Sequence, residues 1–288
     1  MKQPLATITA ITSLTFALAS AGVTDHSDHS DHSDHSDHSA HNSGDFLGSD
    51  FSRGWLDPVG AHKHSSTGDS LYIHPLTVEA AFNDNDFFLD YAFNSFDDED
   101  EHEIEVELEL ALSRRFGLVL ETAYEFENED GSTNEGFADF GVAARIVLVE
   151  YQNFIATANL GFGIPIGDDD FTEDQFTLEP GLLFWFNLGN GFSLNTAIGA
   201  EYGTESEETE LSFDAALVKQ VYGPLALTFE SRNTVGVNGD ERGDITSEAT
   251  LGAVYQFSDY TAIRAGWSFP IDNSEFNGGA ILSLNYAF

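Results

Sequence analysis

The stretch EIEVELELALSRRFGLVLETAYEF, residues 103–126, decides the fold because its apolar side chains return at every second position. Before the SRRFG turn, the apolar residues occupy the even positions from Ile104 to Leu112, and glutamates occupy most of the odd positions between them. Successive side chains of a β-strand point to opposite faces. The stretch therefore predicts two strands joined by a tight turn, each with one apolar face.

The same alternation recurs along the chain and predicts twelve strands. Their predicted ranges are 86–95, 103–112, 115–126, 137–149, 152–164, 174–186, 191–203, 208–218, 223–235, 245–257, 259–269 and 277–288. The predicted links alternate between two kinds. Long acidic links fall near 94–103, 127–136, 167–174, 203–210, 236–244 and 271–279, and the tight links are SRRFG, EYQ, NLGNG, KQVYG and SDY. Long loops at one end and short turns at the other are typical of outer-membrane barrels, whose long loops face outward.

A soluble β-sandwich is the competing explanation, since it also has half-buried strands. Its apolar faces need a second covering layer, which this sequence does not supply. Lipid can cover the apolar face instead, and a closed barrel leaves no unpaired strand edge in hydrocarbon. Aromatic residues also gather at the strand ends, as in the girdles of membrane barrels. We therefore expect an all-β fold, a transmembrane antiparallel up-and-down β-barrel of about twelve strands over residues 85–288, with outer-membrane lipid as its partner.

Composition and the chain end narrow the class further. The 288 residues contain 50 acidic and 10 basic residues, a net charge of −40, so nucleic acid is not an expected partner. Cysteine is absent, which excludes disulfides, thiolate metal sites and a cysteine nucleophile. The last residues, GGAILSLNYAF, alternate up to Phe288. A C-terminal aromatic resembles the assembly signal of Gram-negative outer-membrane proteins, so we expect the barrel assembly machinery to engage this strand.

The first 84 residues divide into three predicted parts. Residues 1–21 combine Met1-Lys2, an apolar stretch and Ala19-Ser20-Ala21, which is typical of a secretory signal peptide cleaved after Ala21. Residues 22–44 form a polar His/Asp/Ser-rich tract that has little to bury, so we expect a disordered arm. Residues 45–84 are predicted to be an irregular linker or an inward-folding segment. The predicted location is the outer membrane, with the arm in the periplasm.

The arm contains five Asp-His-Ser triplets and one further histidine. Imidazole and carboxylate groups favour Zn, Cu or Ni. The candidate ligands are His26, His29, His32, His35, His38 and His41. Three extended residues span about 9 Å, so neighbouring imidazoles share a metal only if the chain bends, and we expect weak binding. A solvated spacer is the alternative, and no cofactor is required.

The second face of the strands is predicted to line the barrel interior. The predicted inward acidic residues are Asp90, Glu105, Glu107, Glu109, Glu121, Glu125, Asp139, Glu179, Glu201, Glu210, Asp214, Glu230 and Glu248. The predicted inward basic residues are Arg145, Arg232 and Arg264. An acidic lumen indicates a passage that prefers cations. The alternatives are an interior sealed by Arg–Glu pairs and a charge that reflects a salty habitat, and twelve strands lie between filled and open barrel sizes.

Catalysis is not expected. A Ser-His pair on the barrel wall needs a histidine there, and all ten histidines lie at or before His102. Carboxylate chemistry has no marked pair in the sequence.

Four stretches resemble a known family: residues 103–126, GFADFGVAARIVL (136–148), FGIPIGD (162–168) and LEPGLLFWFNLGNGFSLNTAIGAEYG (178–203). Their strand and turn pattern is similar to the outer-membrane transporters grouped with the phenol meta-degradation pathway (MetA-like) barrels. The resemblance covers roughly residues 72–288 and implies a barrel with a transport role, without naming a substrate. We expect a channel or transporter for a small solute, with a cation or metal as the candidate cargo; the alternative is a non-transporting structural or surface-exposed barrel.

Overall fold

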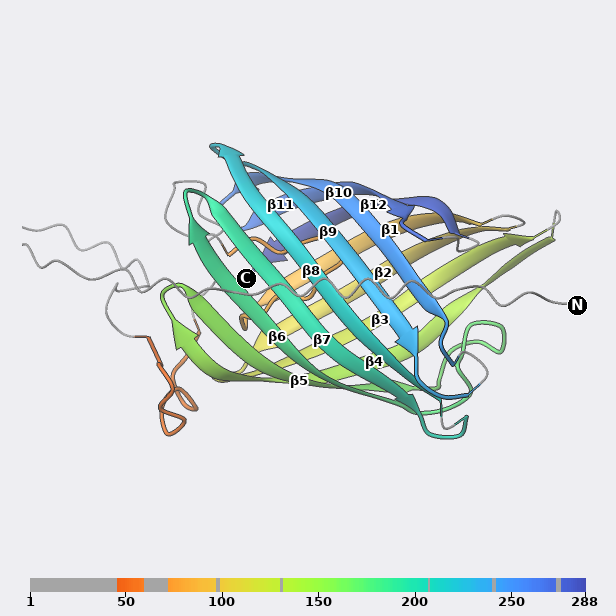
Figure 1. Ribbon diagram of the computed structural model, residues 1–288, viewed down its shortest axis with the longest axis horizontal. Helices are drawn as coiled ribbons and strands as arrows, with labels where there is room; N and C mark the ends of the chain where they lie inside the picture. The colour runs from red at the N-terminus through yellow and green to blue at the C-terminus, as the bar shows by residue number, and fades with distance from the viewer. Residues whose placement is uncertain are drawn as a thin grey trace, which may run out of the picture. The chain divides into compact units, whose positions relative to one another are not determined.

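The computed structural model describes residues 46–59, 72–96, 99–129, 132–206, 208–239, 242–272 and 276–288. In these ranges the chain forms twelve antiparallel strands, and β1 pairs with β12 to close a barrel (Figure 1). The strands are β1 Asp86–Phe96, β2 Glu99–Ala111, β3 Phe116–Glu129, β4 Ser132–Tyr151, β5 Phe154–Ile164, β6 Thr177–Gly189, β7 Phe192–Gly203, β8 Thr209–Tyr222, β9 Leu225–Gly236, β10 Ile245–Ser258, β11 Thr261–Pro270 and β12 Phe276–Ala287. The predicted twelve-stranded β-barrel is confirmed. Among the described residues, no helix has the length and apolar character needed to cross a membrane.

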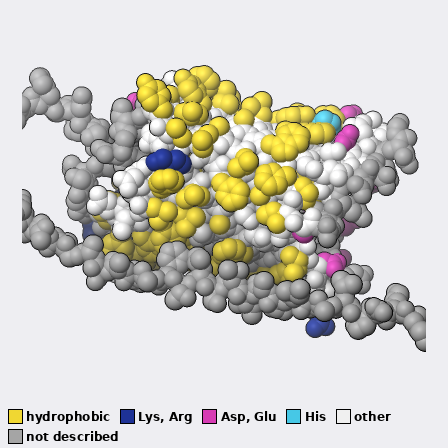
Figure 2. Space-filling model, turned by 45° about the horizontal axis from the view of Figure 1, so that its top comes forward, with side chains coloured by type: hydrophobic (Ala, Val, Ile, Leu, Met, Phe, Trp, Pro, Cys, Tyr) yellow, Lys and Arg dark blue, Asp and Glu magenta, His cyan; other side chains and the backbone are white. Residues whose placement is uncertain are grey.

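The two faces of each strand differ, as the alternation predicts. On the outer face, Leu251 is 56% exposed and Trp267 is 54% exposed. Figure 2 shows hydrophobic side chains spread over the visible face of the wall. On the inner face, Glu109, Trp185 and Asn195 are almost completely buried. The barrel therefore presents apolar side chains outward, as expected in a bilayer, and both polar and apolar side chains to its interior.

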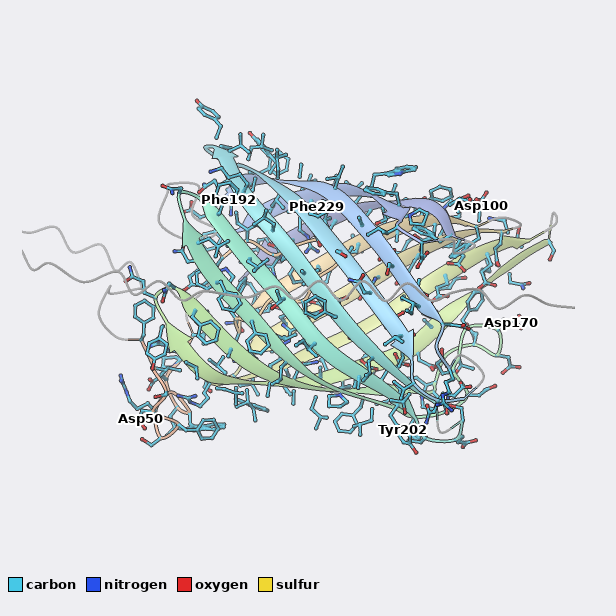
Figure 3. All side chains as sticks on the ribbon, viewed as in Figure 1. Asp50, Asp100, Asp170, Phe192, Tyr202 and Phe229 are labelled. Atoms are coloured by element: carbon cyan, nitrogen blue, oxygen red, sulfur yellow. The ribbon has the colours of Figure 1, made fainter. Side chains whose placement is uncertain are left out.

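The two ends of the barrel carry different links. At one end β6 and β7 are joined at Gly189, Asn190 and Gly191, which all have positive φ angles (78°, 53° and 75°). Glycine and asparagine tolerate this left-handed region, so the chain can reverse within a few residues. We call this the tight-turn end and the opposite one the long-link end. Asp50 and Phe192 lie at the tight-turn end, and Asp100, Asp170 and Tyr202 lie at the long-link end (Figure 3).

Two of the six predicted long acidic links are wrong. Strands β1 and β2 remain paired as far as Ser95↔Asp100, and β3 and β4 remain paired as far as Glu129↔Ser132. The acidic residues near 94–103 and 127–136 therefore belong largely to strands. The antiparallel backbone hydrogen bonds continue through these acidic residues, so the acidic composition does not end the strands.

Residues 72–85, which we call the inner segment, lie within the barrel near its tight-turn end. Ile73, Val78 and Phe82 are each less than 9% exposed, although the segment has no regular secondary structure. Tyr72 stacks on the inward-facing Trp185 of β6, with 4.8 Å between the ring centroids. The inner segment thus supplies an apolar core to this half of the barrel. The sequence predicted either a linker or an inward-folding segment here.

Residues 46–59 pack against the turns at the tight-turn end. Gly48 forms a bridge with Glu150 of β4, through backbone hydrogen bonds of 2.9 and 3.2 Å. Arg115, in the turn between β2 and β3, donates to the carbonyl oxygens of Asp50 (2.9 Å) and Arg53 (2.6 Å). These contacts fix residues 46–59 to the rim of the barrel.

Candidate functional site

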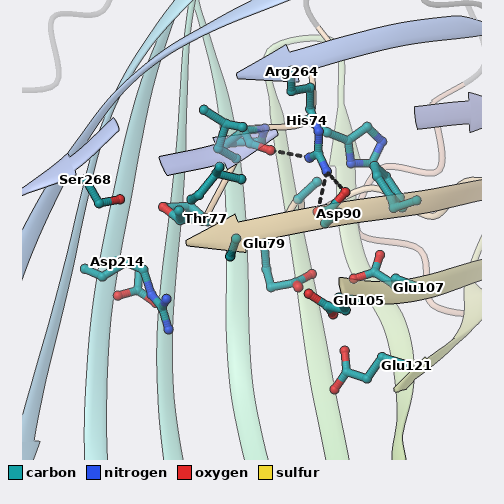
Figure 4. A pocket seen from close by; sticks show the side chains of 18 of the residues that line it. His74, Thr77, Glu79, Asp90, Glu105, Glu107, Glu121, Asp214, Arg264 and Ser268 are labelled. Atoms are coloured by element: carbon teal, nitrogen blue, oxygen red, sulfur yellow. Dashed lines mark hydrogen bonds and ion pairs between the residues drawn. The ribbon is translucent and has the colours of Figure 1, made fainter. Parts of the chain in front are cut away.

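A cavity of about 380 Å³ lies between the inner segment and the barrel wall (Figure 4). Residues 74–80 of the inner segment line one side, and side chains from strands β1, β2, β3 and β8 to β12 line the rest. Nine carboxylates line this cavity, against two arginines. The nine, which define what we call the acidic vestibule, are Glu79, Asp90, Glu103, Glu105, Glu107, Glu109, Glu121, Asp214 and Glu248.

Strand β2 supplies four of these carboxylates because its glutamates occupy alternate positions. Side chains at every second residue share one face, so Glu103, Glu105, Glu107 and Glu109 all point into the cavity. The register places Asp90 of β1 opposite Glu105. The EIEVELELA pattern therefore builds a carboxylate ladder that runs from the tight-turn half toward the long-link end.

Strand β3 brings a further carboxylate onto this ladder. Glu121 lies directly opposite Glu107 in the β2–β3 register. Oxygen atoms of Glu105, Glu107 and Glu121 lie within 4.8 Å of one another. Like charges directly opposite on one face of a sheet are destabilising. A bound cation would relieve this repulsion, and carboxylate oxygens are suitable ligands for hard cations.

Arginines neutralise part of the vestibule. Arg264 contacts Asp90 at 3.1 Å and donates to the hydroxyl of Ser283 at 2.8 Å. Arg232 lies 3.5 Å from Glu248. Arg145 pairs with Glu109 at 2.5 Å and also with Glu79 of the inner segment.

The other carboxylates of the ladder have no such counter-charge. Among the glutamates that line the vestibule, four form no ion pair with a described arginine or lysine: Glu103, Glu105, Glu107 and Glu121. The vestibule therefore keeps an uncompensated acidic face on β2 and β3.

The inner segment is held by hydrogen bonds to the wall. Glu230 of β9 is fully buried, and its carboxylate accepts from the backbone N–H of Leu76 (2.8 Å), the backbone N–H of Thr77 (2.7 Å) and the Thr77 hydroxyl (2.9 Å). The Thr157 hydroxyl of β5 donates to the carbonyl of Ala81. Arg264 donates to the carbonyl of Pro75. These anchors come from separate strands, so the segment is tied across the barrel.

Two glycines make room for the segment. A Cβ on Gly266 of β11 would lie 2.6 Å from the Leu76 side chain, and a Cβ on Gly252 of β10 would also overlap it. Any larger residue at these positions would push Leu76 away from the wall. Glycine here serves close packing of the inner segment.

His74 lies deeper, next to Asp84 and Asp86. Burial disfavours the charged imidazolium, but hydrogen bonds to Asp84 and Asp86 outweigh this and raise the pKa of His74 to about 10. The aromatic rings of Phe82 and Phe88 pack edge-on against the imidazole, at 4.8 and 5.1 Å between centroids. The electrostatic potential at His74 is therefore strongly negative, because of the two neighbouring carboxylates.

The structure places the residues singled out in the sequence as follows. Six line the cavity: Glu105, Glu107, Glu109, Glu121, Arg232 and Arg264. Arg145 is buried and joins Glu109 to the inner segment. Asp139 instead accepts from the backbone N–H of Gly167 (2.9 Å) and Glu173 (3.0 Å), in the β5–β6 link. Glu179 accepts a hydrogen bond from the Thr177 hydroxyl at 3.0 Å and is not among the residues that line the cavity. The candidate metal ligands His26 to His41 lie outside the described residues.

Sequence reasoning missed the polar groups of the inner segment. Glu79 lines the vestibule, and His74 and Asp84 form a buried cluster with Asp86. Residues 72–85 have no strand or helix period, so the sequence offered no indication of which side chains face the wall. Their density of apolar residues, in YIHPLTVEAAF, was the one available indication of burial.

Residues 104–288 match the family model described as "Putative MetA-pathway of phenol degradation". The match covers more than half of the chain, and the chain belongs to this family of outer-membrane barrels, as the strand pattern predicts. No curated protein matches the chain.

Solved structures with a similar fold include the COG4313 outer membrane channel from Pseudomonas putida F1. That match has a TM-score of 0.58 and 13% identity, and covers 75% of this chain and 100% of the channel. The NanC porin matches with a TM-score of 0.51 and 7% identity, over 70% of this chain and 98% of the porin. The translocator domain of the autotransporter NalP from Neisseria meningitidis has a TM-score of 0.51 and 10% identity, over 73% of this chain and 90% of that domain. At these identities the similarity shows the fold, which is that of an outer-membrane, porin-like barrel.

Proposed function

We propose that this protein is an outer-membrane channel for small cationic solutes, closed at rest by its inner segment. The observation that carries the proposal is the uncompensated acidic face of Glu103, Glu105, Glu107 and Glu121 in the vestibule. Carboxylates that line a pore favour cations and disfavour anions. A cleft of one sign of charge also raises the local concentration of the opposite ion.

The inner segment determines how such a channel works. It occupies the tight-turn half of the barrel and is bound there by Glu230, Arg264 and Arg145. A solute that enters from the long-link end reaches the vestibule first and passes farther only when the segment moves aside. The second candidate is a barrel that does not transport, and it is favoured by the same observation, that the inner segment fills the tight-turn half of the barrel.

Conductance in planar bilayers separates the two candidates. The folded protein should give unit conductance steps, and its reversal potential in a salt gradient should show a preference for cations. A triple variant, Glu105→Gln, Glu107→Gln and Glu121→Gln, should lose most of that preference while retaining its steps.

The matched control is Glu205→Gln, which removes one acidic charge from the exposed β7–β8 link. This variant should leave the reversal potential almost unchanged. Silence of the folded wild-type protein would support the non-transporting barrel, and a preference for anions would contradict the proposed charge selection.

The proposal also covers the His-rich arm and the insertion of the barrel into the outer membrane. The arm would lie in the periplasm and bind Zn, Cu or Ni weakly. The barrel assembly machinery would insert the barrel by way of the strand that ends at Phe288. Transport, and not catalysis, is the assigned activity, in keeping with compared structures that are named as a channel, a porin and a translocator domain.

A further inference from the structure

Three buried side chains converge where the inner segment meets β1. His74 and Asp84 belong to the inner segment, and Asp86 is the first residue of β1; they are 6%, 4% and 0% exposed. The Nε2 atom of His74 lies 3.0 Å from Oδ2 of Asp86 and 3.5 Å from Oδ2 of Asp84. One ligand atom from each of the three residues lies within 4.8 Å of the other two.

We propose that His74, Asp84 and Asp86 bind a divalent transition-metal ion, with Zn²⁺ the best fit. In a tetrahedral zinc site with bonds of roughly 2.0 to 2.1 Å, neighbouring ligand atoms are about 3.3 Å apart. The two separations from His74 Nε2 lie close to this value. One imidazole nitrogen with carboxylate oxygens is also a donor set that zinc accepts.

Glu109 offers a fourth ligand. It lies directly opposite Asp86 in the β1–β2 register and is 3% exposed. Directly paired residues have Cβ atoms about 5 Å apart, so the two carboxylates share one part of the inner face. Oε1 of Glu109 accepts from Arg145 at 2.5 Å, whereas Oε2 has no hydrogen-bond partner among the described residues. A buried carboxylate oxygen without a donor is costly, and coordination to a metal would satisfy it.

The charge balance at this position also favours a divalent cation. Asp84, Asp86 and Glu109 bring three carboxylates into a buried region, where Arg145 pairs with Glu109. A metal ion on Nε2 of His74 takes the place of the imidazolium proton, which is released on binding. Phe82 and Phe88 cover two sides of the imidazole and fix its ring plane. A ligand ring held by packing binds metal without first losing rotational freedom.

Such a metal would join both ends of the inner segment to the wall. His74 lies near the start of the segment, and Asp84 lies at its end beside β1. One ion therefore closes the loop 74–86 and holds the segment in place, independently of which solute the vestibule accepts. This site is distinct from the His-rich arm in sequence and from the cluster of Glu105, Glu107 and Glu121 in position.

The test uses the full chain, so the candidate metal ligands of the arm are removed first. In this background the six histidines of the arm become serine: His26→Ser, His29→Ser, His32→Ser, His35→Ser, His38→Ser and His41→Ser. The folded, chelator-treated barrel is titrated with Zn²⁺ by calorimetry and with Co²⁺ by visible absorption. We expect one equivalent per chain and the absorption bands of a low-symmetry, tetrahedral Co²⁺ site that Zn²⁺ displaces.

Variants decide whether the assigned residues bind the ion. Asp84→Asn and Asp86→Asn keep the side-chain shape, and each should weaken binding by at least about tenfold. Asp168→Asn, at the long-link end, is the matched control and should bind like the background protein. Heat-dependent mobility on detergent gels shows that each barrel is folded. No binding by the folded background protein, or equal binding by both cluster variants and the control, would overturn the proposal, whatever the conductance measurements show.

Discussion

Replacing Glu230 with glutamine should loosen the inner segment while keeping the size and shape of the side chain. The Glu230 carboxylate accepts three hydrogen bonds, two from backbone N–H groups and one from the Thr77 hydroxyl. Glutamine offers one carbonyl oxygen, and its NH₂ group replaces the second acceptor. One backbone N–H of the inner segment then faces a donor, at a side chain that is fully buried.

The magnitude follows from the groups that are left without a partner. A buried donor without an acceptor costs about 1 to 3 kcal/mol, and loss of the charge weakens the remaining bonds. Part of this is offset because a neutral amide is easier to bury than a carboxylate. We take a net cost of about 2 kcal/mol, which corresponds to a roughly 30-fold rise in the ratio of displaced to seated segment, since each 1.36 kcal/mol is a factor of ten.

Single-channel recording measures this ratio as open probability. At the same voltage and salt concentration, the ratio of open to closed time should be about 30 times higher for the Glu230→Gln barrel than for the wild-type barrel. Glu179→Gln is the control, because Glu179 bonds to Thr177 and not to the inner segment. An unchanged open probability in folded Glu230→Gln, or an equal rise in Glu179→Gln, would show that Glu230 does not hold the inner segment in place.

Three further predictions concern the register, the orientation and the arm. Leu108→Arg places a charge on the lipid face and should cost about 2 to 4 kcal/mol near the bilayer midplane, whereas Glu107→Gln should be tolerated; folding titrations in lipid vesicles that gave the opposite order would contradict the assigned register. An epitope tag after Gly131 should be accessible to antibody on intact cells, and detection only after lysis would reverse the orientation. A peptide of residues 22–44 should release or absorb heat with Zn²⁺ at about pH 7.5 but not at about pH 5.5, because imidazoles protonate below about 6.5. Absence of heat at both pH values would remove the arm as a metal site.

The barrel wall could be predicted from the sequence because its chemistry repeats with the period of a strand. Ile104 and Val106 face outward, and Glu105 and Glu107 face the cavity, as their alternation requires. The length of each strand was less predictable. Acidic residues near Asp100 suggested a loop, yet the backbone ladder continues through them because the wall extends into water.

The inner segment could not be predicted in the same way. Its contacts join residues that are far apart in the chain, such as Thr77 and Glu230, which are 153 positions apart. No local pattern encodes which carboxylate on a distant strand will accept its N–H groups. Glu230 was predicted to face inward, but its role as an anchor depends on a segment whose path has no period. The alternation of side chains along each strand therefore predicts which residues face the lumen. The three-dimensional structure is needed to show which segment fills it.

The path of the inner segment also has a topological consequence. Tyr72 packs on Trp185 close to the β6–β7 turn, and Asn85 accepts from the backbone N–H of Phe288 beside the start of β1. Both ends of the inner segment, at Tyr72 and Asn85, therefore lie at the tight-turn end of the barrel. The segment can be withdrawn without unpairing a single rung of the sheet, so the wall and the segment can lose their order in separate steps, at different temperatures or different applied forces.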